Sequence, residues 1–347
     1  MSTVQRENEI DTGIAKLSGE AALPRVEPEV ENISWRGLPE PDRSDPSYFD
    51  RPLLHEPVWE WAIPLYYYIG GAAGASLVMG AAAQLDGSGR FDRFIRRTHL
   101  AGILGSAASA VLLIHDLGKP SRFHHMLRVF RPTSPMNVGA WILSTIAPSA
   151  FVASLLARRR GFAGAFGEIS GVASGLAGLG LSTYTGVLVA NTAVPLWQES
   201  RRILPILFGA SAMASAGSLF DLFVEDRAAR RITYTFGTLG RAAELAAGFA
   251  MERLAARKSP RIAEPFKTGT SGALWRASTI LTAGSLIAAL LPRRSRRQRV
   301  IAGALGTAGS LLLRFAVHHA GIASSRDPRA VFRQQTPALE PQKSPNA

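Results

Sequence analysis

GGAAGASLVMGAAA, residues 70–83, decides the fold class of this chain. The stretch has no charged side chain, and its small residues let a neighbouring helix approach closely where lipid provides no hydrophobic drive between helices. SGVASGLAGLGLS, residues 170–182, has the same composition. The two stretches therefore indicate closely packed helices inside a membrane.

Further apolar runs follow along the chain. A helix needs about 20 apolar residues to cross a bilayer. Arg241, Glu244 and Glu252 make the run at 232–256 the weakest, although most of its other residues are small or apolar. The sequence predicts an all-α integral membrane protein with eight transmembrane helices in two four-helix bundles. The expected spans are about 62–85, 98–117, 136–157, 169–193, 203–224, 232–256, 272–291 and 299–319.

The spans also suggest where the parts of the chain begin and end. Both ends of the chain are rich in proline and charged residues and predict extended tails. The expected parts are an acidic N-terminal tail at 1–58, a first four-helix bundle at 59–198, a second at 199–320 and a polar tail at 321–347.

Composition agrees with a membrane protein and excludes several other classes. Hydrophobic residues make up 47% of the 347 residues, and there are 33 glycines. The net charge is +13, but the arginines fall in short groups between apolar runs, so we expect a lipid bilayer and no nucleic acid as the partner. The absence of cysteine excludes disulfides and cysteine-ligated iron–sulfur clusters on this chain.

The distribution of basic residues predicts the orientation in the membrane. With eight spans, one set of short loops holds fifteen arginines, whereas the longer loops on the side of the termini hold ten basic residues. Basic loops stay in the cytoplasm. We therefore expect a multi-pass protein of the inner (plasma) membrane with both termini on the extracytoplasmic side.

Several polar residues lie near the extracytoplasmic ends of the expected spans. Tyr66 and Tyr67 lie just inside the first span, and His115 and Asp116 close the second. The tyrosines could instead form an aromatic belt at the headgroups. Tyr184 lies roughly 13 Å deep at the helical rise, too deep for a belt. Its phenol needs a partner, which is either a functional group or an interhelical hydrogen bond.

Asp116 is the residue that a structural role explains least. A carboxylate at the C-terminal end of a helix opposes the helix dipole, whereas Lys119 and Arg122 can neutralise the last carbonyls there. Ionisable groups near the bilayer are functional hypotheses by default. Because no histidine lies in the middle of a span, we expect no haem and no metal site.

Charged residues in the later spans leave a second possibility. Asp221, Arg241 and Glu244 could line a proton or solute path, or they could pair with one another or with nearby arginines. Arg314 is expected to extend its side chain toward the membrane surface. The alternatives to a redox function are therefore a transporter or proton-translocating channel, and a purely structural anchor.

Four segments together resemble the NrfD/PsrC-type family, the membrane subunits of polysulfide-reductase-like molybdopterin oxidoreductase complexes. The resemblance covers about residues 55–325 and is strongest over the first five spans. The matching segments are VWEWAIPLYYYIGGAAGA at 58–75, IHDLGKPSRFHHMLRVFRPTSPMNVGAW at 114–141, STYTGVLVANTAVPLW at 182–197 and LPILFGASAMASAG at 204–217.

The resemblance implies a function. Members pass electrons between a quinone, menaquinone or ubiquinone, in the first bundle and a four-cluster-type iron–sulfur subunit, which relays them to a molybdopterin catalytic subunit. It implies eight helices in two four-helix bundles, no haem and no substrate-side catalytic residue on this chain. Relatives reduce or oxidise substrates such as polysulfide, thiosulfate or formate on that other subunit.

The resemblance also implies roles for particular residues. The family's deep tyrosine falls on Tyr184, and a histidine of its sulfur-reducing members falls on Tyr66. The HDLGxP element matches His115, Asp116 and Pro120. The residues implied at the quinone are Tyr184, Tyr66, Tyr67, His115 and Asp116, and those implied at the partner subunit are Lys119, Arg122, Arg128, Ser134 and Met136.

Overall fold

A computed structural model describes residues 54–117, 119–157, 159–223, 226–292 and 295–335. Most of the expected N-terminal tail and the end of the C-terminal tail lie outside these residues. Within them the chain is helical and contains no strand, which confirms the all-α prediction for the described part.

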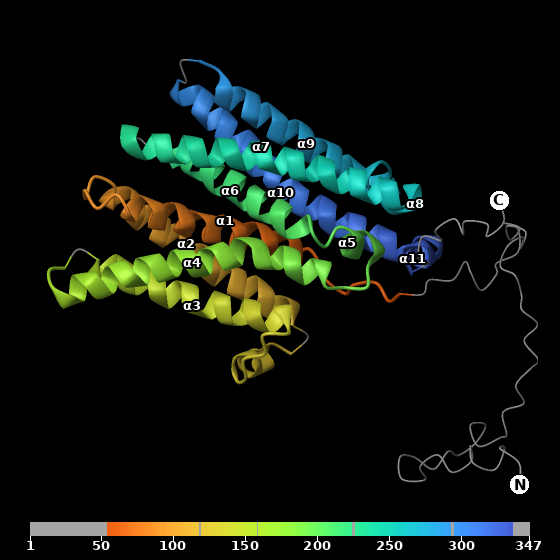
Figure 1. The fold of residues 1–347 in the computed structure, drawn as a ribbon, viewed down its shortest axis with the longest axis horizontal. Helices are drawn as coiled ribbons and strands as arrows, with labels where there is room; N and C mark the ends of the chain where they lie inside the picture. Colours follow the sequence, from red (N-terminus) through yellow and green to blue (C-terminus); the bar gives the residue numbers. More distant parts are fainter. Residues whose placement is uncertain (1–53, 118, 158, 224–225, 293–294, 336–347) are drawn as a thin grey trace, which may run out of the picture. The chain divides into compact units, whose positions relative to one another are not determined.

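The described residues form eight long helices. These helices run side by side (Figure 1). Short helical segments connect them or extend them at one end. The long helices are α1 (Ala62–Gln84), α2 (Asp92–Asp116), α3 (Pro135–Leu156), α4 (Phe162–Ala190), α6 (Leu204–Phe223), α7 (Arg227–Lys258), α9 (Gly269–Leu290) and α10 (Arg296–Arg326). The short ones are η5 (Pro120–Leu127), α5 (Pro195–Glu199), α8 (Pro260–Ala263), η6 (Glu264–Phe266) and α11 (Pro328–Gln335).

Seven of these helices are long and apolar enough to cross a membrane. The exception among the long helices of the described residues is α7, which corresponds to the weakest predicted span. Arg241 and Glu244 in its middle are nevertheless buried, at 0% and 3% exposure, and Glu252 accepts a hydrogen bond from the Trp275 indole of α9 at 3.3 Å. Arg241, Glu244 and Glu252 therefore have polar partners on neighbouring helices, which mean hydropathy does not register.

Small residues set the distances between the helices. Helix α1 packs against α2 and α4, and α6 packs against α7 and α10. A Cβ atom added to Gly74 of α1 would lie 2.4 Å from the carbonyl oxygen of Gly178 in α4, and one at Gly217 of α6 would lie 2.3 Å from the Cα of Gly237 in α7. The glycine-rich stretches of the sequence thus lie where two backbones touch.

The first and last long helices meet at one end of the helix set, which we call the rim. Glu56, just before α1, pairs with Arg326 at the end of α10 at 2.7 Å. The ring Nε2 of His318 lies 3.2 Å from the Trp59 carbonyl oxygen. The N-terminal end of α1 and the C-terminal end of α10 therefore lie together at the rim.

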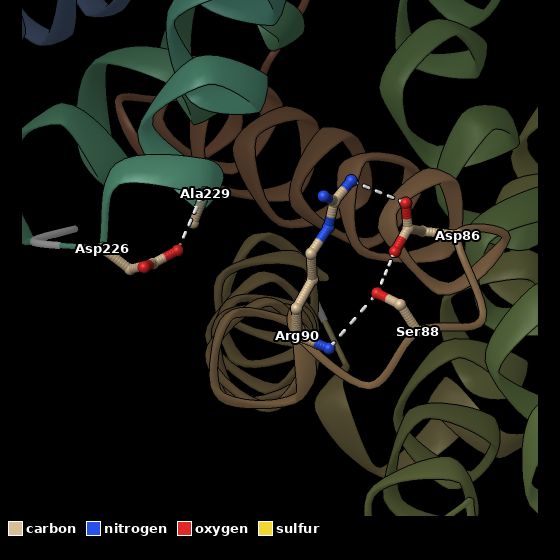
Figure 2. Close-up of polar contacts among 5 residues, drawn as sticks. All are labelled: Asp86, Ser88, Arg90, Asp226 and Ala229. Atoms are coloured by element: carbon tan, nitrogen blue, oxygen red, sulfur yellow. Dashed lines mark hydrogen bonds and ion pairs between the residues drawn. The ribbon is translucent and has the colours of Figure 1, made fainter.

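The other end of the helix set holds the loop between α1 and α2 and the start of α7 (Figure 2). Asp86 pairs with Arg90 at 2.7 Å and accepts a hydrogen bond from the Ser88 hydroxyl. These two contacts hold the pKa of the Asp86 carboxyl below its usual value. Asp226 caps α7 by accepting a hydrogen bond from the Ala229 backbone N–H at 2.9 Å. We call this end the arginine-rich end, after the basic residues in and beside its short loops.

Candidate functional site

Two adjacent tyrosines of α1 are buried near the rim. Tyr66 and Tyr67 are 0% and 1% exposed, and their ring centroids lie 5.7 Å apart. Neither hydroxyl has a hydrogen-bond partner among the described residues. Burial on this scale argues against an aromatic belt at the headgroups, and an unsatisfied buried hydroxyl calls for a ligand or a water.

The surroundings of Tyr66 come from three helices. A Cβ atom added to Gly70, one turn further along α1, would lie 3.2 Å from the Ser109 hydroxyl of α2, 3.6 Å from a Leu181 methyl of α4 and 3.7 Å from the Tyr66 ring. The Ser109 hydroxyl also has no partner among the described residues. The Tyr66 ring and the Ser109 hydroxyl therefore both border Gly70, where α1, α2 and α4 meet.

Tyr67 faces the second group of helices. Its ring centroid lies 5.8 Å from that of Phe208 in α6. The Arg314 guanidinium of α10 also stacks on Phe208, 3.9 Å from its ring centroid, and donates a hydrogen bond to the Phe208 carbonyl at 2.8 Å. Tyr67 thus lies beside a contact that joins α1, α6 and α10.

Arg314 corrects one expectation from the sequence. Its side chain is 1% exposed and points into the helix set, so the prediction that it extends toward the membrane surface is wrong. Its Nε and Nη1 atoms have no hydrogen-bond partner among the described residues. The packing of Phe208 under the guanidinium holds it inside, and no periodicity in the sequence signals that contact.

Tyr184 lies in the same buried apolar cluster as Tyr66 and Tyr67. It is 8% exposed, and its ring lies directly over Gly139 of α3, where any side chain would overlap it. The missing side chain at Gly139 therefore makes the space that this phenol occupies. Gly139 is a site residue that the sequence did not single out.

His115 and Asp116 end α2 at the rim. His115 is exposed, and its ring centroid lies 6.0 Å from that of Trp61. Asp116 is partly buried and accepts a long hydrogen bond, 3.5 Å, from the Glu60 backbone N–H. The Asp116 carboxylate lies within electrostatic range of the Tyr67 phenol. The carboxylate is thus a partly buried charge at the rim whose field reaches one tyrosine of the buried pair.

The loop after α2 presents basic residues at the rim. Lys119, Arg122 and Arg128 are exposed, and Met136 is 43% exposed. Ser134 instead caps α3 and accepts a hydrogen bond from the Asn137 backbone N–H at 3.4 Å.

Asn137 holds this loop in place and was not recognised in the sequence. Its side-chain amide donates hydrogen bonds to the carbonyls of Met126 at 2.7 Å and Val129 at 3.0 Å. Its side-chain oxygen accepts one from the Arg131 backbone N–H at 2.6 Å. An asparagine just inside a helix that begins with serine and proline was the available signal.

The three charged residues of the alternative function connect helices. Arg241 lies 3.2 Å from Asp221 and donates to the Ser218 hydroxyl at 2.9 Å, which joins α7 to α6. Glu244 accepts hydrogen bonds from Thr282 of α9 and Ser310 of α10, each at 2.7 Å. Partners on neighbouring helices explain these buried charges, so transport is not the favoured function.

The fold and the site together define a class of protein. Seven apolar helices identify a multi-pass membrane protein, and its buried tyrosines near one rim are accompanied by a carboxylate and a basic loop. The family model described as "Polysulphide reductase, NrfD" matches residues 51–324. The chain belongs to the NrfD family, whose members are membrane subunits of quinone-linked oxidoreductase complexes. No curated protein matches the sequence significantly.

Proposed function

We propose that this chain is the quinone-reactive subunit of such a complex, passing electrons between the membrane quinone pool and an iron–sulfur subunit of a molybdopterin oxidoreductase. The observation that supports this most directly is the pair of buried phenols, Tyr66 and Tyr67, whose hydroxyls have no partner among the described residues. Quinone carbonyls accept hydrogen bonds, and buried hydroxyl donors fit them.

Each residue of the site has a separate part in this proposal. Tyr66 and Tyr67 donate hydrogen bonds to the quinone oxygens, and Tyr184 supplies a further phenol from α4. Asp116 and His115 hold and exchange protons between the buried donors and water at the rim. A bound menaquinone or ubiquinone supplies the two-electron, two-proton chemistry.

We further propose that the basic loop at the rim binds the iron–sulfur subunit, which is of the four-cluster type and contacts the molybdopterin catalytic subunit. Exposed Lys119, Arg122, Arg128 and Met136 support this assignment, since charged and methionine side chains there are free to meet a partner. Ser134 serves the same surface indirectly because it fixes the start of α3.

The proposed topology has eight spans, grouped as two four-helix bundles at 59–198 and 199–320 in the inner membrane. Support for α7 as a span comes from its neighbours. It begins just after α6 ends at the arginine-rich end, and the start of α9, which follows α7, lies with Glu56 and Arg326 around one cavity at the rim. Its 32 residues correspond to about 48 Å of helix. With eight spans both termini are extracytoplasmic.

Substitution of one tyrosine tests the proposal. Tyr67→Phe removes a hydroxyl donor and keeps the ring packing on Phe208. We expect the complex to remain assembled and the rate at which added quinol reduces the iron–sulfur clusters to fall about tenfold, the value of one lost hydrogen bond to a reacting group. The clusters are followed by electron paramagnetic resonance in complex purified through a tag on this chain.

Tyr234→Phe is the matched control. Tyr234 lies near the start of α7, at the arginine-rich end, and its loss should leave the rate unchanged. Equal rates in the Tyr67 variant and the unsubstituted chain, with the clusters intact, would contradict the proposed site.

A further inference from the structure

A second polar site lies at the arginine-rich end. A cavity of about 310 Å³ opens between the N-terminal ends of α7 and α10. Four guanidinium groups, one phenol and one carboxylate surround it. The lining residues are Asp221, Arg227, Arg230, Arg231, Tyr234 and Arg299.

The two acidic residues that the structure describes at this cavity already have partners. Asp221 is buried and pairs with Arg241 at 3.2 Å. Asp226, beside the cavity, accepts the hydrogen bond from the Ala229 N–H that caps α7 (Figure 2). The cavity therefore has an excess of positive charge.

Three of the cations lie outside every ion pair that the described residues form. Within residues 54–335, as far as the structure describes them, Arg227, Arg230 and Arg231 form none. All three lie in the first turns of α7, and Arg227 and Arg231 are exposed. Like charges four residues apart, such as those of Arg227 and Arg231, repel each other and destabilise the helix. An external anion would remove that repulsion.

Exposed apolar side chains follow the cavity-lining residues within two positions along α6 and α10. Phe223, at the end of α6, is 63% exposed, and Val300 and Ile301, next to Arg299 on α10, are 41% and 44% exposed. In a chain that crosses a membrane, such side chains face acyl chains. A ligand that reaches both surfaces has an anionic head and an apolar tail.

We propose that this cavity binds the phosphate of an anionic phospholipid headgroup. The planar guanidinium presents paired N–H donors that match phosphate oxygens, and arginine is the usual residue for such recognition. Basic pockets at the membrane surface between transmembrane helices bind acidic headgroups in this way. The site lies at the opposite end from the tyrosines, so it does not depend on the proposed quinone function.

Lipid retention by the full chain tests the site. Chain purified in neutral detergent is titrated with phosphatidylglycerol or phosphatidylcholine, and the lipids retained per chain are counted by native mass spectrometry. We expect one tightly retained phosphatidylglycerol and no equivalent phosphatidylcholine. The triple variant Arg227→Gln, Arg230→Gln, Arg231→Gln should bind phosphatidylglycerol on the order of 100-fold more weakly, about fivefold for each arginine.

The control variant removes three arginines elsewhere. Arg93→Gln, Arg159→Gln, Arg160→Gln changes the net charge by the same amount at exposed positions outside the cavity. It should retain the lipid as the unsubstituted chain does. Equal loss in both triple variants, or equal retention of the two lipids, would overturn the proposal.

Two further arms complete the test. Inorganic phosphate shares the headgroup chemistry, and displacement of the lipid by a few millimolar phosphate would show a free-anion site instead of a lipid site.

If the triple variant does not fold, Arg230→Lys keeps the charge and loses the paired donors. That variant should weaken phosphatidylglycerol binding severalfold, and unchanged binding would count against the site.

Discussion

Arg314 carries a contact between helices that are far apart in the sequence. Its guanidinium bonds to the Phe208 carbonyl and stacks on the Phe208 ring, and its Nη2 lies 3.4 Å from the Cβ position of Gly71 in α1. Gly71 of α1 therefore borders the guanidinium. Glu244 on α7 lies within its electrostatic range. One buried cation therefore holds α1, α6 and α10 together.

Loss of this cation should destabilise the fold. Arg314→Met keeps the length of the side chain but removes the hydrogen bond to Phe208 and the charge that faces Glu244. We expect the free energy of unfolding to fall by about 2 kcal/mol, measured as a lower melting temperature in detergent. Arg253→Met is the control, because Arg253 also stacks on a phenylalanine, Phe249, at 4.2 Å but is exposed. A similar melting temperature for both variants would contradict the role of Arg314.

The ion pair between Glu56 and Arg326 makes the stability of the rim depend on pH. The hydrogen bond and charge of Arg326 hold the pKa of the Glu56 carboxyl below its usual value. A lowered pKa means that the ion pair is complete above the ordinary glutamate pKa, about 4.3, and is lost as the pH falls through the lowered value. The protection factors of the backbone amides in residues 54–61, which compare the measured exchange rate with the intrinsic rate at the same pH, should therefore be larger at pH 7 than near pH 3.

Glu56→Gln separates this titration from general acid effects. Its protection factors at residues 54–61 should be small already at pH 7 and change little as the pH falls. A variant that exchanges as slowly as the unsubstituted chain at pH 7 would show that the ion pair does not restrain this segment.

At the residue scale, the sequence predicts which groups are unusual but not where they point. Tyr184 is recognised as too deep in its span for an aromatic belt, because the helical rise gives the depth of a residue from its position in the sequence. Depth does not reveal that the ring lies over Gly139 on α3, since that contact depends on how two helices are rotated against each other. Arg314 was misjudged for the same reason.

At the scale of helices, close backbone contact holds α6 against α7. Gly217 and Gly237 lie so close that a side chain at either position meets backbone atoms of the other helix. Helices in lipid gain stability from such packing. This contact brings Asp221 within reach of Arg241, so the glycines and the ion pair support each other.

A matched pair of glycine substitutions tests this contact. Gly217→Ala places a methyl group 2.3 Å from the Gly237 Cα, and we expect it to lower the free energy of unfolding by about 1–3 kcal/mol. Gly248→Ala, whose nearest neighbour is Trp275 at 3.6 Å, should be neutral or stabilising. Thermal unfolding in detergent measures both, and equal melting temperatures would contradict the argument.

Most of the helices could be predicted, and α7 shows where the prediction weakens. Apolar length identifies the seven other long helices because lipid requires a backbone with all its hydrogen bonds made within the segment. In α7, Arg241 and Glu244 lower the average hydropathy although both are buried. Arg241 pairs with Asp221 of α6, and Glu244 accepts hydrogen bonds from Thr282 of α9 and Ser310 of α10. The sequence of α7 alone cannot predict these partners because they belong to other helices.

At the scale of the molecule, the path of α7 decides the topology. If α7 crosses the membrane, its two ends lie on opposite sides and both termini share one side. The chain has no cysteine, so single introduced cysteines can be labelled without background. Ser121 on η5 and Lys258 at the end of α7 are exposed at the rim, and Arg227 is exposed at the other end.

Labelling of intact cells with a membrane-impermeant maleimide should follow these positions. We expect Ser121→Cys and Lys258→Cys to react while the cytoplasmic membrane is intact, after any outer membrane has been permeabilised. Arg227→Cys should react only after the cytoplasmic membrane has been broken. Reaction of the Arg227 and Lys258 variants from the same side would show that α7 does not cross.

The meeting of the segment before α1 with the end of α10 at the rim has a consequence for biosynthesis. The segment before α1 finds its partners on α10, through Glu56 with Arg326 and Trp59 with His318. Helix α1 therefore cannot complete its contacts at the rim until α10 is inserted. A chain truncated before α10 keeps this segment exposed, which offers cellular quality control a means to distinguish finished from unfinished subunits.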